Sequence, residues 1–454
     1  MKLFLQIILV LQLTCIFLTQ ACNYLRFFDN YPLIVKRNID TLPPSNTSEP
    51  STKWIEQPVD HFNANDNRTW KMRYFENLDY WQPKSPVYLY LNKMSDVSDE
   101  FLRTGLMHDL AKETNGAMYA SEHRFYGESQ PFEIYSVQNF AYLNSRQALA
   151  DIAKLLKEIK QLPQYKDSKV VVVGGTNAGN LAAWFKLLYS EMVDAAIASS
   201  APVLAKKDFY EINELFQTSA GIETIKRENG ICEGSDLTKP ANKHILYSDL
   251  AQRYAYYAML GTTESIKTYC DQNTISSMYG VWNDIFTENN DCGLWDNSLK
   301  CFYIDFDYIA ELMKKYGVPS LYQSCTEFGQ FPSTSSNKQP FTDNIHIDFY
   351  NQMCTKVFGP EFNEERLDKG VKNTNKMFGG LKPNVSHVVF VNGELDPWSR
   401  LGVLEDLSPE APAKVIPRTG NCKDLEPNDP DDLEELREAR KYVKQMIKKW
   451  INAA

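Results

Sequence analysis

The 454-residue chain lacks the cysteine and histidine patterns that bind zinc. It contains no Cys-x-x-Cys pair and no His-Glu-x-x-His motif, so a metal site is not expected. It also lacks an excess of basic residues: 48 Lys and Arg stand against 58 Asp and Glu, for a formal net charge of −10. A phosphate-binding surface is therefore disfavoured, and nucleic acid is not an expected partner. No cofactor is expected.

Only one long hydrophobic run is present, and it lies at the start of the chain. Leu3 to Leu18 is nearly uncharged and is followed by Thr19-Gln20-Ala21, with small residues where signal peptidase cuts. This pattern predicts an export signal at 1–21, and a membrane anchor is the alternative. No later stretch approaches the length of a membrane span, so the processed chain is expected outside the membrane, secreted to the extracellular space or, alternatively, in the lysosome.

Cysteine usage agrees with export. Removal of the signal with Cys15 leaves eight of the nine cysteines, an even number that favours disulfides without specifying their pairing. Six of the eight fall between 232 and 354, so that segment is expected to be the most heavily cross-linked. N-glycosylation sequons, which also fit the secretory pathway, begin at Asn46, Asn67 and Asn384.

Short buried strands alternate with helices over much of the chain, which predicts an α/β fold with a parallel sheet. Apolar runs rich in β-branched and aromatic residues predict strands at 87–91, 117–120, 170–173, 193–199, 388–391 and 415–416. Apolar residues three and four apart predict helices at 147–162 and 433–451, and 181–189 is also helix-forming. Residues 204–380 lack this alternation. The predicted organisation is an extended leader at 22–50, a core at 51–203 and 381–454, and a mainly helical, disulfide-rich cap at 204–380.

A glycine-rich turn and a late aspartate suggest a hydrolase site. Gly174-Gly175-Thr176-Asn177-Ala178 joins a predicted strand to a helix, as in a Gly-x-Ser-x-Gly nucleophile elbow, but threonine replaces serine. Asp396 follows a late strand, where the acid of an α/β-hydrolase triad belongs. The alternatives are a plain strand-to-helix turn and a turn or capping aspartate. The histidine should follow Asp396, yet the last of the six histidines is His387.

Several motifs resemble the serine peptidase family of prolyl carboxypeptidase, dipeptidyl peptidase II and thymus-specific serine protease, which cut next to proline. They are found at 57–63, at 122–129 (Glu-His-Arg-Phe-Tyr-Gly-Glu-Ser), at 147–151, at 198–203, at 323–329 and at 396–398. The resemblance runs from about Trp54 to the C-terminus and implies an α/β-hydrolase fold with a helical cap.

The resemblance places the family's catalytic serine on Thr176, its aspartate on Asp396 and its histidine on Asn421. A Gly-Gly-Glu-Gly-like turn near the oxyanion hole falls close to Asn92-Lys93-Met94-Ser95, which is unlike it. Because an internal threonine without a base is a poor nucleophile, we predict a catalytically inactive pseudopeptidase that acts by binding peptides or a protein partner. The alternatives are an active exopeptidase with an unusual base, such as His123 or His387, and an exported structural or storage protein. The resemblance also allows a homodimer.

Overall fold

The structure of the chain is a computed structural model that describes residues 50–92, 94–213, 235–236, 239–245, 247–248, 295–296, 301–302, 305–337 and 345–452. The predicted export signal and all of the predicted leader except Pro50 lie outside these residues. So do Asn46, Lys93, five of the nine cysteines and much of the predicted cap. The sequons at Asn67 and Asn384 lie at exposed positions.

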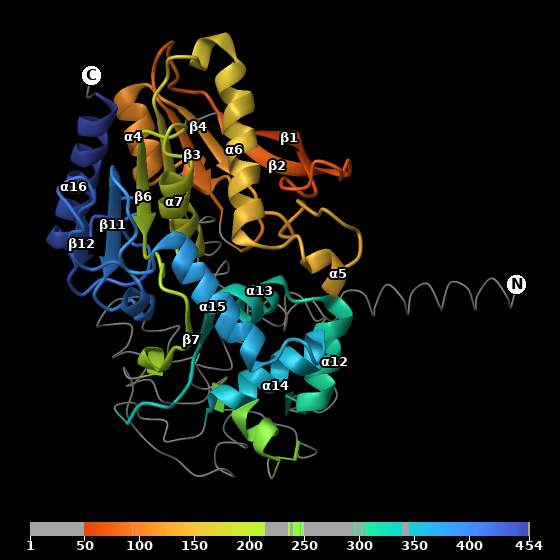
Figure 1. The fold of residues 1–454 in the computed structure, drawn as a ribbon. Coiled ribbons are helices and arrows are strands. Elements are labelled where there is room, and N and C mark those ends of the chain that lie inside the picture. Colours follow the sequence, from red (N-terminus) through yellow and green to blue (C-terminus); the bar gives the residue numbers. More distant parts are fainter. Residues whose placement is uncertain are drawn as a thin grey trace, which may run out of the picture.

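A mostly parallel sheet of eight strands forms the centre of the described chain (Figure 1). Its order is β1-β2-β4-β3-β5-β6-β11-β12. β1 and β2, and β2 and β4, pair antiparallel, whereas every other neighbouring pair is parallel. The strands are β1 (Ser51–Pro58), β2 (Thr69–Asn77), β3 (Val87–Leu91), β4 (Ala117–Ser121), β5 (Val170–Gly175), β6 (Ala195–Ser199), β11 (Val388–Gly393) and β12 (Ala413–Ile416). This order is that of the α/β-hydrolase fold, as predicted.

Two layers of helices cover the two faces of the sheet because alternate strand residues point to opposite sides. On β5, Val170 and Val172 pack against helices α6 (Ser145–Gln161) and α7 (Asn177–Leu188). Val171 and Val173 face α4 (Leu106–Thr114) and α16 (Glu434–Ile451) on the other side (Figure 1). Because every strand residue of β5 is buried, the run contains no polar residue.

Beyond the carboxyl ends of the strands, the described part of 204–380 is largely helical (Figure 1). It contains α12 (Phe306–Tyr316), α13 (Pro319–Gln323), a turn of π-helix η4 (Ser324–Phe328), α14 (Ile347–Phe358) and α15 (Glu364–Phe378). Two small sheets accompany these helices: β7 (Lys206–Asp208) with β10 (Gly329–Phe331), and β8 (Trp295–Asp296) with β9 (Cys301–Phe302). α5 (Val137–Phe140), from the core segment, packs on the same helices.

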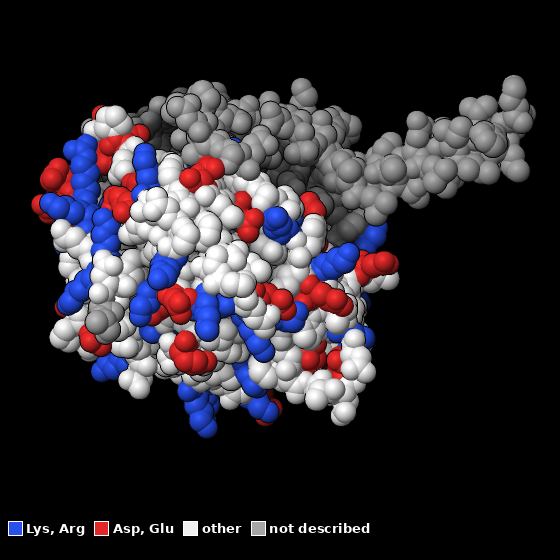
Figure 2. All heavy atoms as spheres, turned by 90° about the horizontal axis from the view of Figure 1, so that it is seen from above, with Lys and Arg blue, Asp and Glu red and all other residues white. Residues whose placement is uncertain are grey.

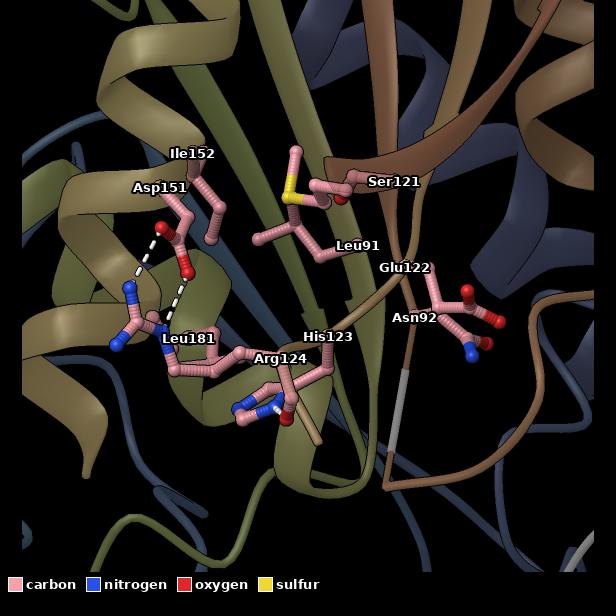
Figure 3. Close-up of a pocket in the computed structure, with 11 residues that line it drawn as sticks. Leu91, Asn92, Ser121, Glu122, His123, Arg124, Asp151, Ile152 and Leu181 are labelled. Atoms are coloured by element: carbon pink, nitrogen blue, oxygen red, sulfur yellow. Dashed lines mark hydrogen bonds and ion pairs between the residues drawn. The ribbon is translucent and has the colours of Figure 1, made fainter. Parts of the chain in front are cut away.

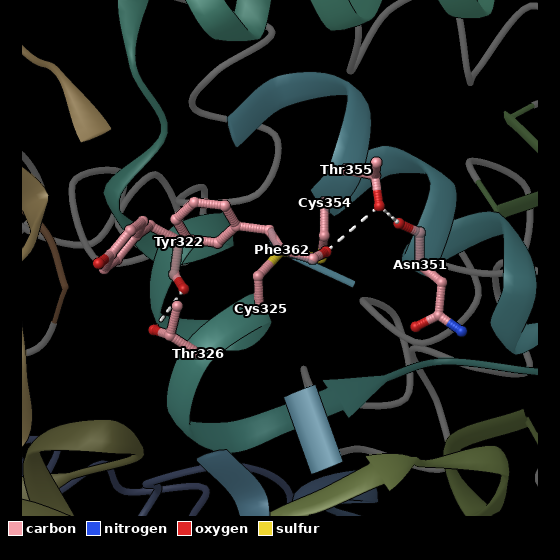
Figure 4. The surroundings of a disulfide bond; sticks show 7 residues. All are labelled: Tyr322, Cys325, Thr326, Asn351, Cys354, Thr355 and Phe362. Carbon is pink, nitrogen blue, oxygen red and sulfur yellow. Dashed lines mark hydrogen bonds between the residues drawn. A yellow bond between two sulfur atoms is a disulfide. The ribbon is translucent and has the colours of Figure 1, made fainter. Parts of the chain in front are cut away.

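A disulfide between Cys325 and Cys354 joins η4 to α14 (Figure 4). The Thr355 hydroxyl, next to it, donates to the Asn351 and Phe362 carbonyl oxygens. The bridge agrees with the predicted cross-linking of this segment.

The surface carries charges of both signs. On the face seen in Figure 2, basic and acidic side chains are interspersed. Within the part of the chain that the structure describes, every helix is too short or too polar to span a bilayer.

Candidate active site

Thr176 lies at the sharp turn between β5 and α7. Its backbone has φ of 52° and ψ of −125°, a left-handed conformation that is strained for a β-branched residue. The turn is tight because the backbone packs on itself: a Cβ on Gly174 would lie 2.1 Å from the Ala178 carbonyl oxygen. The local geometry is thus that of a nucleophile elbow, with a threonine in the nucleophile position.

Among the residues that the structure describes, none is a base hydrogen-bonded to the hydroxyl of Thr176. It donates a hydrogen bond of 2.7 Å to the carbonyl oxygen of the preceding Gly175. All six histidines of the chain lie within the described residues, and none of them hydrogen-bonds Thr176. The hydroxyl therefore keeps its proton.

Asp396 and Asn421 are hydrogen-bonded to each other. Asp396 follows β11 and is 1% exposed; its Oδ1 accepts from the Trp398 backbone N–H at 3.0 Å. Its Oδ2 accepts from the Asn421 side-chain Nδ2 at 3.1 Å. Burial raises the pKa of the Asp396 carboxyl to about 6. Asn421 therefore donates to the Asp396 carboxyl through a neutral amide.

The loop of Asn421 also contacts the elbow. A Cβ on Gly175 would lie 2.7 Å from the Cys422 sulfur, so the 421–422 loop rests directly against the residue before Thr176. Sequence reasoning placed Thr176, Asp396 and Asn421 by chain order and resemblance. The structure brings Asp396 and Asn421 into contact and places the side chain of Cys422, the next residue of the loop, against the elbow.

Ser200 ties the loops together, and the sequence analysis assigned it no role. It follows β6 with φ of 47°, its hydroxyl oxygen accepts from the Cys422 N–H at 2.9 Å, and its side chain also hydrogen-bonds Asp396. The neighbouring Ser199 hydroxyl donates to Asp424 at 2.5 Å. The only sequence feature that pointed to Ser200 was its place in the small-residue motif at 198–203.

His123, one of the two alternative bases, lies in a small buried pocket (Figure 3). Its Nδ1 hydrogen-bonds the Arg124 carbonyl oxygen at 2.7 Å, and burial lowers the pKa of the imidazole to about 4. It lines a second pocket together with Asn177, next to Thr176. The ring is therefore a weak base with a backbone partner.

His387, the other alternative, lies at the wrong end of a strand. It immediately precedes β11, whereas Asp396 follows its carboxyl end; a strand of six residues is roughly 20 Å long. The imidazole packs on Trp450, with ring centroids 5.2 Å apart. His387 therefore lies at the amino-terminal ends of the parallel strands, whereas Thr176 lies at their carboxyl ends.

Three of the motifs form a buried ionic network instead of a catalytic one. The Arg124 guanidinium is fully buried and binds both carboxylate oxygens of Asp151, with Nε to Oδ2 at 2.6 Å and Nη2 to Oδ1 at 2.7 Å (Figure 3). The His61 Nε2 lies 2.7 Å from Asp151 Oδ1. The motifs at 57–63, 122–129 and 147–151 thus join β1, the loop after β4 and α6.

No metal site is evident in the described part of the chain, which contains no group of three His, Cys, Asp or Glu side chains suited to hold an ion.

The sequence model of the serine carboxypeptidase S28 family matches residues 57–291 and 312–443, well over half of the chain. The chain belongs to this family. Thymus-specific serine protease from Mus musculus is 28% identical over 453 residues, covering 88% of each chain. Lysosomal Pro-X carboxypeptidase from Bos taurus is 28% identical over 462 residues, covering 90% of this chain and 89% of the relative.

Similar solved structures are more distant. A proline iminopeptidase from Mycobacterium smegmatis covers 88% of this chain and 99% of its own, with 12% identity and a TM-score of 0.36. The family recognised from the motifs is thus confirmed by the family match and the named relatives.

Proposed function

We propose that this S28 family protein is a pseudopeptidase, which binds peptides or a protein partner without cleaving them. The observation that carries the proposal is the pair Asp396–Asn421: an amide donates to the acid where an imidazole should stand. An amide nitrogen is essentially nonbasic and cannot take the hydroxyl proton of Thr176. Loss of the serine or the histidine of a triad costs about a million-fold in turnover, or roughly 8 kcal/mol of barrier.

For the competing function, an exopeptidase with a non-standard base, the described part of the chain offers no base in position. His123 has a backbone partner and a depressed pKa, and His387 lies at the far edge of the sheet. Asp396 is held by the Trp398 N–H and by Asn421, and the structure shows no hydrogen bond between it and Thr176. A protonated hydroxyl attacks an amide too slowly to support turnover.

The retained scaffold supports the binding half of the proposal. The elbow, the acid loop and the loop of Asn421 still converge at one edge of the sheet. Relatives named as a serine protease and a Pro-X carboxypeptidase suggest peptides as the ligand class. We place the protein in the extracellular space or the lysosome, on the hydrophobic run of Leu3 to Leu18.

Hydrolysis of Xaa-Pro reporter peptides tests the proposal. The purified protein should give no turnover above the Thr176→Ala variant, because neither has a base-activated nucleophile. The double variant Thr176→Ser with Asn421→His should gain turnover, because it restores the hydroxyl and the base at the end of an intact acid loop.

Binding is measured with the same peptides by fluorescence anisotropy. Saturable binding by the unmodified protein is expected. Turnover by the unmodified protein that Thr176→Ala abolishes would refute the proposal. Failure of every reporter peptide to bind would exclude these peptides as the ligand and leave a protein partner as the binding function.

A further inference from the structure

Met94 is packed beside the elbow, on the loop that follows β3. Its sulfur accepts a hydrogen bond from the Asn177 side-chain Nδ2 at 3.1 Å. Asn177 is the residue directly after Thr176 and the first residue of α7. A thioether therefore lies next to the residue that follows the nucleophile position.

In α/β-hydrolases, the space between the loop after β3 and the residue that follows the nucleophile holds the negatively charged oxygen of the reaction intermediate. The N–H after the nucleophile and an N–H from the loop after β3 form the oxyanion hole of α/β-hydrolases. As the first residue of α7, Asn177 has an N–H with no partner inside the helix, and Thr176 provides no side-chain cap. The backbone donor of an oxyanion hole is thus retained.

The side chain of Met94 cannot do the work of an oxyanion hole. A thioether sulfur is a weak acceptor with no hydrogen to donate, so it offers nothing to a negative oxygen. The side chain is half-buried and packs on two hydrophobic clusters, one under α6 and α7 and one within the helices beyond the sheet. Moving it aside would sacrifice both sets of contacts.

We propose that Met94 blocks the oxyanion side of the site, as a third departure from a working peptidase besides Thr176 and Asn421. This inference rests on the proposed function and makes it more specific: the site can hold a planar peptide but stabilises the tetrahedral intermediate of acyl transfer poorly. Loss of one oxyanion donor costs about 10²–10³ in kcat, so restoring access should recover a factor of that size.

The test compares variants in the background Thr176→Ser with Asn421→His, using 4-nitrophenyl acetate as the probe. In the reaction, the introduced serine oxygen attacks the acyl carbon, the introduced imidazole takes its proton and nitrophenolate leaves; water then releases acetate and the free serine. Adding Met94→Gly should raise kcat about 100-fold with little change in KM. Adding Met94→Leu, the matched control that keeps the bulk, should leave kcat low.

Thermal unfolding of each variant separates folding from chemistry. If Met94→Gly does not fold, Met94→Ala takes its place, with a smaller but definite rise in kcat expected. Equal kcat for the background, the Gly or Ala variant and the Leu variant, including no turnover in all of them, overturns the inference. A rise in the Leu variant equal to that in the Gly variant overturns it too.

Assays of the unmodified protein distinguish a failure of the Met94 inference from a failure of the proposed function. Met94→Gly alone should remain without turnover, since Thr176 still lacks a base. Thr176-dependent turnover by the unmodified protein would refute the proposed function. If the unmodified protein is inactive and substitution of Met94 does not change kcat of the double variant, only the role of Met94 is refuted.

Discussion

Thr176 holds a backbone conformation that an L-residue with a branched Cβ adopts at a cost. Strain of this kind amounts to about 1–3 kcal/mol, and here no catalysis is proposed to require it. The chain retains the elbow because Gly174, Gly175 and the start of α7 pack too closely for the turn to relax.

Replacing Thr176 with glycine should reveal the strain. We expect Thr176→Gly to have a free energy of unfolding about 1 kcal/mol higher than Thr176→Ala, because both lose the hydroxyl bond to Gly175 but only alanine keeps a Cβ at positive φ. Urea denaturation measures the difference. An alanine variant as stable as the glycine variant would show that the turn is not strained.

At the scale of residues, chain order and resemblance could locate Thr176, Asp396 and Asn421, because each lies at a fixed offset from a strand. They placed Met94 only within an atypical turn near the oxyanion hole, without its contact to Asn177, and they gave Ser200 no role. Both act through side chains that fill the space between loops far apart in sequence, and such contacts depend on packing that no local pattern encodes.

Among the elements, buried strands were the most predictable. The runs at Val87–Leu91 and Val170–Gly175 are apolar throughout because both faces of the sheet are covered. The strands β1 and β2 were not predicted. β1 is an edge strand that is largely exposed, and its polar residues give no apolar run to recognise.

The Arg124–Asp151 ion pair connects three elements that carry family motifs: α6, β1 and the loop after β4. We expect Arg124→Met to lower the free energy of unfolding by about 3–5 kcal/mol, because Asp151 would be left buried without its guanidinium. Urea unfolding of the variant measures this loss.

Arg103→Met is the matched control, since it removes a partly exposed ion pair with Asp99 and should cost less than about 1 kcal/mol. Similar losses for the two variants would mean that the buried network does not hold these elements together.

For the molecule as a whole, burial of carboxyl groups gives stability a dependence on pH. Burial raises the pKa of Asp396 and of Asp424 to about 6, and that of Glu327 to about 7. Glu327 lies in η4 and accepts hydrogen bonds from the Ser145 N–H at 3.2 Å and hydroxyl at 3.1 Å, at the start of α6. These carboxyls therefore lie at the site and at the contact between the core and the helices beyond it.

The sign of the pH dependence follows from the difference in proton binding between the folded and unfolded chain. Each of these groups holds its proton to higher pH in the folded chain than in the unfolded one, so its stabilisation is complete below about pH 4 and is lost as pH rises through 6 to 7. His123 acts oppositely, because its lowered pKa weakens the fold as pH falls from about 6.5 to about 4. The three carboxyls together change the free energy of unfolding more than His123 does. The pKa of the half-buried His244 is also lowered, so His244 acts in the same direction as His123.

We therefore expect the thermal midpoint of the unmodified protein to be higher at about pH 5 than at about pH 7.5. Asp396→Asn removes one of the three groups and should shrink that difference. The corresponding difference in free energy of unfolding should fall by about 1 kcal/mol, since only part of the pKa shift from 3.8 to about 6 falls between these two pH values. Asp429→Asn, on an exposed loop, should leave the difference unchanged. A midpoint that rises with pH would mean that the three buried carboxyls do not set the pH dependence. A difference untouched by Asp396→Asn would mean that the Asp396 carboxyl is already ionised in the fold at pH 5.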